Sequence, residues 1–413
     1  MRETAVERER VRSEPSSSGT PPAPAPERRA SNWVKGVAPL ALLALVIITF
    51  MKWDPASVFR TAFPPIEELT IQRIVLPATG VMQVQVINGG PEPVTVAQVF
   101  VDDAAWTHTM DGPRRIERLA SRTITIPYPW VEGEPHAVRL VSSTGLTFDG
   151  EVAVATQSPR PSFRFLAVFA TLGIYVGVIP VFLGLLWLPF LRSVQRKWVD
   201  FFLSLTIGLL VFLGVDALAE ALEVSARVAG AFQGLSLVLL GVLGTPLTIA
   251  SIGEWRRRTG QGLSPLYVSA LIALAIGLHN LGEGLAIGAA YSTGEISLGA
   301  FLVLGFLLHN TTEGLGIVAP LAQERISVRQ LVMLGLLAGA PTILGTWLGG
   351  FSYSPVAVTL FFAIGAGAIV QVIYELWKLF ARRAESGITR PLNAAGVLIG
   401  LAVMYVTGLL VTA

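Results

Sequence analysis

The pattern of hydrophobic and polar positions changes along the chain and separates four regions. Residues 1–32 mix charged residues with Pro, Ser and Ala and hold almost no large apolar side chains. Such a segment cannot bury enough apolar surface to offset the entropy that a chain loses on folding. We therefore expect residues 1–32 to form a disordered tail.

An apolar run over residues 37–51 follows this tail, with basic residues on both sides. A run of this length is typical of either a signal peptide or a single anchoring helix. No A-x-A cleavage pattern follows closely, and the polar leader is longer than that of an ordinary signal peptide. These features favour an uncleaved anchor helix over residues 33–53.

The period of the pattern becomes two between about residues 69 and 156. Segments such as "MQVQVIN" and "RTITIPY" alternate apolar and polar residues between Gly, Pro and Asn turns. This alternation indicates strands with one buried face, so we expect residues 64–158 to form a small immunoglobulin-like β-sandwich. The strand pattern places His108 and His136 too far apart for a metal site, and we expect both on the solvated surface.

Beyond Pro159 the chain becomes a series of long apolar segments, each near the roughly 20 residues that span hydrocarbon. They predict a core of eight transmembrane helices over residues 163–413. The segments cover residues 163–191, 198–218, 228–252, 266–291, 298–322, 328–350, 356–380 and 392–411.

Composition agrees with a polytopic membrane protein. Of the 413 residues, 52% are hydrophobic and only 14% are charged. The net charge of +2 gives no reason to expect a nucleic-acid partner. The sequence contains no cysteine, which excludes disulfides, thiolate metal sites and thiol catalysis.

Basic residues collect in every second loop of the predicted core. Because cytoplasmic loops carry an excess of Lys and Arg, these four loops are expected to face the cytoplasm. The tail is then cytoplasmic, and the β domain and the carboxyl terminus are extracellular, in a multi-pass protein of the plasma membrane. The loop residues are Arg192, Arg196, Lys197, Arg256, Arg257, Arg258, Arg325, Arg329, Lys378, Arg382, Arg383 and Arg390.

Two polar motifs interrupt the apolar fourth and fifth core segments: "HNLGEG" begins at His279 and "HNTTEG" at His309. Residues four apart share one face of a helix, so each motif presents a histidine and a glutamate together, with an asparagine beside them. If the two helices are antiparallel neighbours, the motifs converge at one depth. Imidazole and carboxylate donors suit zinc, iron or manganese. The predicted metal residues are His279, Asn280, Glu283, His309, Asn310 and Glu313.

Other interpretations of these motifs remain open. The polar groups could satisfy one another as interhelical hydrogen bonds, although paired carboxylates in a low dielectric repel one another unless a cation or a proton intervenes. An intramembrane metalloenzyme would also use histidine and glutamate, but the sequence has no H-E-x-x-H helix. A metal-responsive receptor with a ligand-binding β domain is the third alternative.

The paired motifs, on the fourth and fifth of eight helices with outward termini, resemble the ZIP family of divalent metal transporters, above all its prokaryotic branch. The resemblance covers roughly residues 163–413. It implies a transporter that moves a divalent metal, most often Zn²⁺, toward the cytoplasm, without enzyme activity or a resident cofactor. Its expected partners are divalent metal ions and the lipid bilayer, and a homodimer is compatible with it.

The resemblance also implies a two-site centre between the fourth and fifth helices. His279, Glu283, His309 and Glu313 would form the first site. The second site would use Asn280 and Asn310, with the same two glutamates as bridges.

Three positions depart from the family pattern. Many prokaryotic members have proline where Gly282 and Thr312 stand here, so a helix kink at these positions would be weaker or made by glycine. Many also supply a glutamate from the sixth helix, and Ala340 occupies that place here. A centre with a single metal is therefore compatible with this sequence.

Two further pairs of polar residues lie near helix ends. Asp216 and Glu220 share a face at the outer end of the second helix, and Gln371 and Glu375 share one near the inner end of the seventh. We expect these four residues to line the route of the metal. Solvation of helix ends explains them equally well.

Overall fold

The computed structural model describes residues 29–53, 66–260, 264–293, 296–381 and 387–409. Helix α1 (Arg29–Trp53) covers the expected anchor. Its apolar part, Val37–Trp53, is shorter than the helical spans of the core, and its side chains in this part are exposed. The expected disordered tail lies outside the described residues up to residue 28, and α1 already begins at Arg29.

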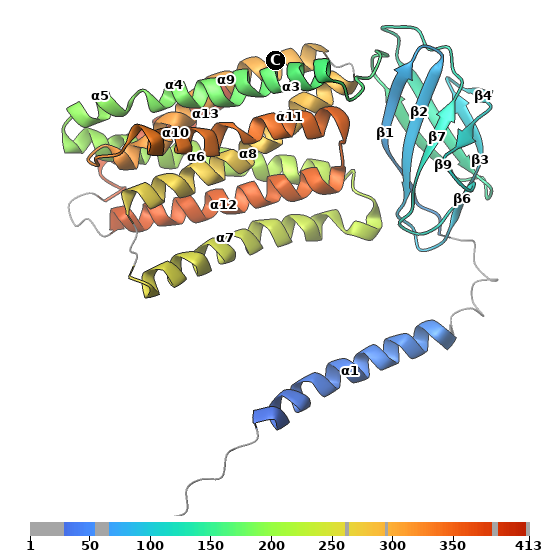
Figure 1. Cartoon of the computed structure of the whole chain (residues 1–413), viewed down its shortest axis with the longest axis horizontal. Coiled ribbons are helices and arrows are strands. Elements are labelled where there is room, and N and C mark those ends of the chain that lie inside the picture. The colour runs from blue at the N-terminus through green and yellow to red at the C-terminus, as the bar shows by residue number, and fades with distance from the viewer. Residues whose placement is uncertain (1–28, 54–65, 261–263, 294–295, 382–386, 410–413) are drawn as a thin grey trace, which may run out of the picture. The chain divides into compact units, whose positions relative to one another are not determined.

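Residues 69–152 form the predicted all-β domain (Figure 1). Two antiparallel sheets have the strand orders β1-β2-β7-β5 and β4-β3-β8-β9, and β6 also pairs with β3. The strands are β1 (Leu69–Ala78), β2 (Val81–Asn88), β3 (Val94–Val101), β4 (Ala104–Trp106), β5 (Thr109–Met110), β6 (Arg115–Ile116), β7 (Ser121–Ile126), β8 (His136–Ser142) and β9 (Thr147–Val152).

Alternation of apolar residues produces the core of this domain. Val84 and Ile124 project from β2 and β7, and Val99 and Leu140 project from β3 and β8. These side chains are fully buried in one cluster. Since both sheets contribute to the cluster, the domain is a sandwich.

The expectation for His136 was wrong, because its side chain is buried and not solvated. His136 Nδ1 lies 2.8 Å from Asp102 Oδ2, which also accepts a 2.6 Å hydrogen bond from the Tyr128 hydroxyl. The backbone N–H of Ala137 donates to the other Asp102 oxygen at 2.9 Å. The sequence pattern did not reveal this contact, because Asp102 follows β3 and is 34 residues from His136. His108 is half-buried.

The rest of the described chain is helical and contains eight helices long and apolar enough to cross a membrane. This confirms the predicted eight-helix core, with the β domain added before it. Its elements are α3 (Phe163–Gly173), the π-helix η1 (Ile174–Val178), α4 (Ile179–Leu185), α5 (Leu188–Ser193), α6 (Arg196–Ser225), the 3-10 helix η2 (Gly230–Phe232), α7 (Gly234–Arg258), α8 (Pro265–Thr293), α9 (Ile296–Val318), the 3-10 helix η3 (Ala319–Leu321), α10 (Val328–Gly339), α11 (Pro341–Phe351), α12 (Pro355–Ala381) and α13 (Pro391–Gly408).

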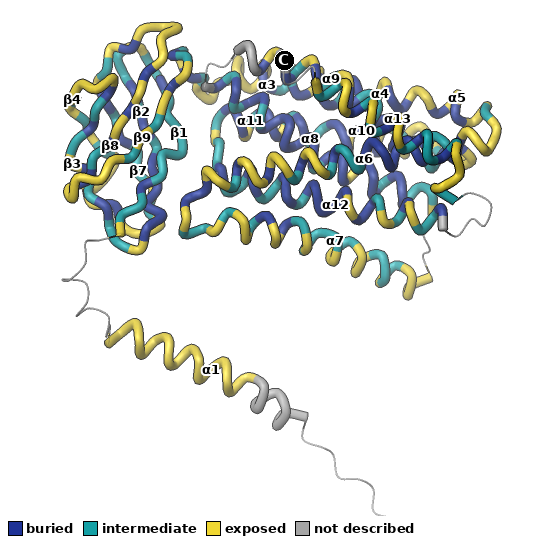
Figure 2. The backbone as a smooth tube through the Cα atoms, turned by 180° about the vertical axis from the view of Figure 1, so that it is seen from behind, coloured by how far each residue is buried: buried dark blue, intermediate teal, exposed yellow. Residues whose placement is uncertain are grey.

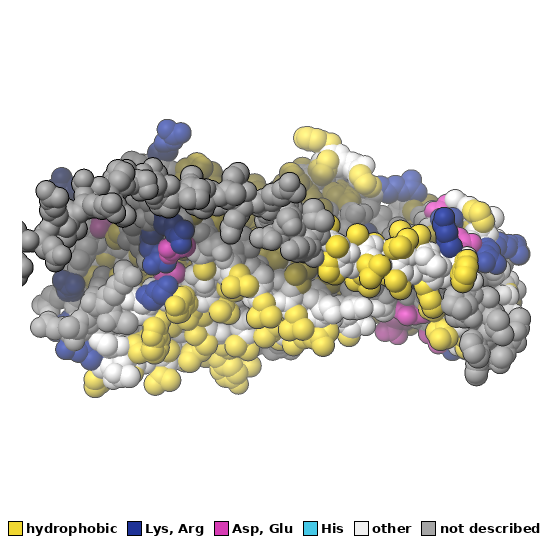
Figure 3. All heavy atoms as spheres, turned by 90° about the horizontal axis from the view of Figure 1, so that it is seen from below, with side chains coloured by type: hydrophobic (Ala, Val, Ile, Leu, Met, Phe, Trp, Pro, Cys, Tyr) yellow, Lys and Arg dark blue, Asp and Glu magenta, His cyan; other side chains and the backbone are white. Residues whose placement is uncertain are grey.

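Burial differs strongly among the spans. Helix α8 lies at the centre of the bundle and packs against α9, α10, α11 and α12, and Figure 2 shows most of its length as buried. Helix α7 lies at the periphery and exposes leucines such as Leu239, Leu243 and Leu247. Hydrophobic side chains cover much of the face drawn in Figure 3, as expected for a surface in contact with lipid.

Small residues allow α8 to approach its neighbours closely. A Cβ atom on Gly284 would overlap the carbonyl oxygen of Thr342 in α11, and one on Gly345 would overlap that of Leu281. Close approach of this kind is typical of helix packing in membranes. It places the polar segment of α8 deep in the protein, away from lipid.

Two spans change their helical geometry near this segment. The first span contains the π-helix η1, and the sixth divides into α10 and α11 around Ala340 and Pro341. Helix α8 is unbroken through Gly282, and α9 is unbroken through Thr312. The interruptions therefore lie in the helices that surround the two motifs.

Asp102 and its partners Tyr128, His136 and Ala137 are expected to stabilise the β domain. Burial and the hydrogen bond to Asp102 raise the pKa of Tyr128 to about 12. Burial alone would raise the pKa of Asp102, but the hydrogen bonds from Tyr128 and Ala137 outweigh it and hold that pKa below its usual value. A carboxylate with a lowered pKa stabilises the fold above its unfolded pKa, and this stabilisation is lost as the pH falls through its folded pKa.

We predict that Asp102→Asn lowers the free energy of unfolding of the β domain at pH 7 by about 1 kcal/mol, a value reduced for solvent screening. The difference from the parent should shrink below about pH 4, where Asp102 itself becomes protonated. Urea unfolding, followed by hydrogen–deuterium exchange of β8 in the full chain, measures it. Asp103→Asn is the matched control, because Asp103 is exposed and has the same left-handed backbone (φ 63°, against 51° at Asp102). Equal midpoints for the two variants would contradict the prediction.

Candidate metal centre

The two polar motifs lie on adjacent helices, as the sequence predicts. Helices α8 and α9 pack against each other and bring the motifs to the same region of the bundle. All six predicted metal residues are buried, with exposed fractions of 4% or less. These residues are His279, Asn280, Glu283, His309, Asn310 and Glu313.

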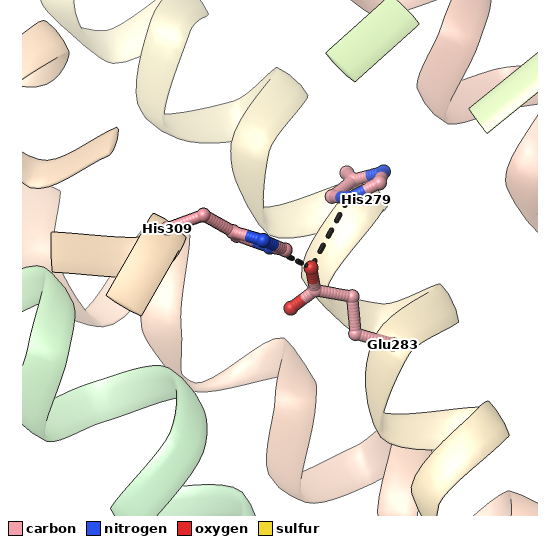
Figure 4. A group of neighbouring side chains, drawn as sticks. All are labelled: His279, Glu283 and His309. Carbon is pink, nitrogen blue, oxygen red and sulfur yellow. Dashed lines mark hydrogen bonds and ion pairs between the residues drawn. The ribbon is translucent and has the colours of Figure 1, made fainter. Parts of the chain in front are cut away.

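Glu283 is the residue at which the motifs meet (Figure 4). One of its oxygens, Oε1, lies 3.2 Å from His279 Nε2 and also contacts His309 Nε2. One donor atom of each residue lies within 4.8 Å of those of the other two. The structure therefore brings three of the six predicted residues into one group that could hold a metal ion.

Asn310 positions the second oxygen of Glu283. Its Nδ2 donates to Glu283 Oε2 at 3.0 Å and to the carbonyl oxygen of Val176 at 3.0 Å. Val176 lies in the π-helix η1, where the altered backbone spacing leaves a carbonyl available to a side chain. The sequence did not indicate Val176, because hydropathy does not distinguish a π-helix from an α-helix.

Asn280 and Glu313 lie outside the group of three. Asn280 Nδ2 donates to the carbonyl oxygen of Ala338, at the end of α10, with a distance of 3.1 Å. The Glu313 carboxylate is buried beside the side chain of Asn280. Glu313 lines a cavity of about 10 Å³, which is the space of about one water molecule. The sixth span contributes the backbone carbonyl of Ala338 to the contact with Asn280, and the side chain of Ala340 has no atom that could bind a metal.

Hydrogen bonding among the motif residues leaves several polar atoms unsatisfied. Among the described residues, the buried atoms without a hydrogen-bond partner include Nδ1 of His279, Oδ1 of Asn280 and Oδ1 of Asn310. A buried polar atom without a partner costs about 1–3 kcal/mol. Hydrogen bonds among the motif residues therefore leave polar atoms that can accept a further ligand.

The predicted route residues divide into two groups. Asp216 and Glu220 line a cavity of about 270 Å³ together with His279, Glu283 and His309. Gln371 and Glu375 do not line it. Gln371 Nε2 donates to Glu375 Oε1 at 3.0 Å, and Lys378 Nζ lies 3.4 Å from the same oxygen.

The donor atoms of the group suit a divalent transition metal. Two imidazoles and a carboxylate are common ligands of zinc, and a sequence without cysteine offers no thiolate that would favour copper(I). A divalent cation would also compensate the negative charge that Glu283 carries into a region of low dielectric.

Comparison with known families agrees with the helix order and the motifs. The family model described as the ZIP zinc transporter matches residues 254–408. The matched region begins near the end of α7, extends into α13 and includes both motifs, whereas the β domain and α6 precede it. No curated protein matches the chain. Residues 254–408 of this membrane chain therefore form a ZIP zinc transporter domain.

Proposed function

We propose that the protein transports divalent transition metal ions across the membrane through the group formed by His279, Glu283 and His309. ZIP family proteins transport divalent metal ions, and this chain carries a domain of that family. The observation that carries the proposal is the buried group in which one donor atom each of His279, Glu283 and His309 lies within 4.8 Å of the others, with His279 Nδ1 still without a partner among the described residues. A transported cation supplies the missing partner.

Zinc is the metal that the donors favour most, with iron and manganese as the alternatives. Imidazole nitrogen and carboxylate oxygen are the usual zinc ligands when thiolates are absent. Iron(II) and manganese(II) accept the same donors, so the ligands alone do not separate the three ions.

The proposed centre holds one principal metal ion. Glu283 contacts both imidazoles, whereas Asn280 donates to a backbone carbonyl and Ala340 contributes no ligand. Glu313 interacts electrostatically with Glu283 and with both histidines, and it is proposed as a further ligand. Asn280 and Asn310 are proposed as weaker, neutral ligands.

Transport toward the cytoplasm is the proposed direction. The basic loops favour a cytoplasmic location for the amino-terminal tail and for the ends of the first, third, fifth and seventh spans. The β domain then lies outside the cell, together with the carboxyl terminus.

Uptake of ⁶⁵Zn²⁺ by proteoliposomes containing the purified full chain tests the proposal. A transporter fills the vesicle interior with metal, whereas a metalloenzyme or a receptor binds metal without moving it. Vesicles that bind zinc at the protein but do not accumulate it would overturn the proposal.

We predict that Glu283→Gln lowers the rate of uptake at least 100-fold, because it removes the one charge that contacts both imidazoles. Glu313→Gln should lower it about tenfold, and Asn280→Ala should lower it less, since asparagine offers only a neutral oxygen. Initial rates in proteoliposomes measure these effects. Glu254→Gln is the matched control, because Glu254 is exposed and paired with Arg257 and Arg258. If Glu283→Gln transports at the parent rate, the proposed centre is wrong.

We predict one tightly bound metal ion per chain. Ala340 leaves the region near Asn280 without a second carboxylate from the sixth span, so a second ion would lack charge compensation. Mass spectrometry of the metal content of purified protein measures the ratio. Ala340→Glu should raise it toward two, and two tight ions in the parent chain would contradict the prediction.

We predict that a membrane-impermeant thiol reagent applied to intact cells labels Thr144→Cys but not Ser17→Cys. The chain has no native cysteine, so each variant reports a single position. Both should react after the membrane is made permeable. Labelling of Ser17→Cys alone in intact cells would reverse the topology.

A further inference from the structure

Asp216 and Glu220 lie on the side of the membrane where the β domain is. The β domain precedes the first span, which begins at Phe163, and α6 is the second span and ends at Ser225 on that same side. Both acids lie in the last third of α6. The cavity that they share with the metal group therefore approaches the group from the β-domain side.

The remaining walls of this cavity agree with that direction. Ala286 lies toward the end of α8, Phe306 toward the start of α9, and Tyr405 toward the end of α13. Each of these helix ends is on the β-domain side, because successive spans alternate in direction. The cavity joins the metal group to that side of the membrane.

The opposite side of the centre is apolar. The small cavity beside Glu313 is lined by Leu209, Leu210, Leu213 and Ile276 among others. It has space for about one water molecule. The larger cavity, which holds Asp216 and Glu220, is therefore the one that connects the group to the β-domain side.

Asp216 and Glu220 differ from the other acids near helix ends in their surroundings. Glu223 pairs with Arg227 at 2.8 Å, Glu254 pairs with two arginines, and Glu375 lies 3.4 Å from Lys378. The described residues provide no hydrogen bond or ion pair to Asp216 or Glu220. Two carboxylates four residues apart on a helix repel each other, so this pair destabilises α6 when no cation is bound between them.

A second observation in the same cavity indicates a cation as the missing partner. His279 is buried and lines the cavity, and its Nδ1 has no hydrogen-bond partner among the described residues, whereas its Nε2 faces Glu283 Oε1 at 3.2 Å. A cation near Asp216 and Glu220 would therefore lie in the same cavity as the imidazole of His279, which could bind it next.

We propose that Asp216 and Glu220 bind the incoming divalent cation before it passes to His279, Glu283 and His309. This inference rests on the proposed transport function. Carboxylate oxygens alone bind divalent cations by charge with little preference among them, whereas imidazoles prefer transition metals. The outer pair concentrates cations at the cavity, and the histidine group selects among them.

Uptake of zinc over a range of concentrations tests the proposal in proteoliposomes containing the full chain. We expect the apparent KM to rise about fivefold in Asp216→Asn and in Glu220→Gln, and about twentyfold in the double variant. The maximal rate should change less than about twofold, because the inner group is intact. Glu220→Asp, which keeps the charge, should retain most of the parent affinity.

Glu254→Gln is the control, since it removes one carboxylate that pairs with two arginines and does not line this cavity. A competition experiment adds a readout that a purely structural role would not change. Millimolar Ca²⁺, an ion that prefers oxygen ligands, should inhibit zinc uptake by the parent and inhibit the double variant less.

The outcomes separate the two proposals. An unchanged KM in the double variant, or a loss of maximal rate without a change in KM, would overturn the outer site while leaving transport established. Equal Ca²⁺ inhibition of parent and double variant would overturn it as well. If the parent accumulates no metal in the vesicles, the proposed function fails, and the outer site fails with it.

Discussion

The burial of the Glu283 carboxylate between two imidazoles is the constraint on which the membrane core depends. A charge inside a bundle surrounded by lipid has no water to solvate it, so the protein or a bound ion must compensate it. His279 and His309 face one oxygen, and Asn310 donates to the other. Each partner comes from a defined position on α8 or α9, so these two helices must keep a fixed relative register.

Glycines and broken helices provide that register. Gly284 and Gly345 bring α8 against α11, and Gly184 and Gly314 bring α4 against α9, at distances where a Cβ atom would overlap backbone atoms. Interruptions in the first and sixth spans make the carbonyl groups of Val176 and Ala338 available to the two asparagines. The same packing keeps lipid away from the polar segment of α8. Its charged and polar side chains therefore face the interior of the bundle, where a bound cation can stabilise them.

The spans and the convergence of the motifs followed from the sequence, because hydropathy and the four-residue helical spacing are local properties. Which of the six motif residues meet at one point did not follow from the sequence. Glu313 has the same spacing as Glu283 but lies outside the group, because spacing along one helix does not determine how that helix is rotated toward its neighbour. His136 was also misjudged, because alternation indicates which face of a strand is buried but not which loop acid it meets.

The position of Asp216 and Glu220 shows the same limit. Their shared helix face was evident from spacing, but only the packing of α6, α8, α9 and α13 shows that they line a cavity with His279, Glu283 and His309 while Gln371 and Glu375 do not.

The identity of the cation ligands is the central claim. X-ray absorption at the zinc edge of the purified chain loaded with one zinc ion tests it most directly. The account predicts two imidazole nitrogens at about 2.0–2.1 Å, with oxygens completing the shell and one imidazole lost in His309→Ala. A shell of oxygens alone, unchanged in His309→Ala, would contradict it.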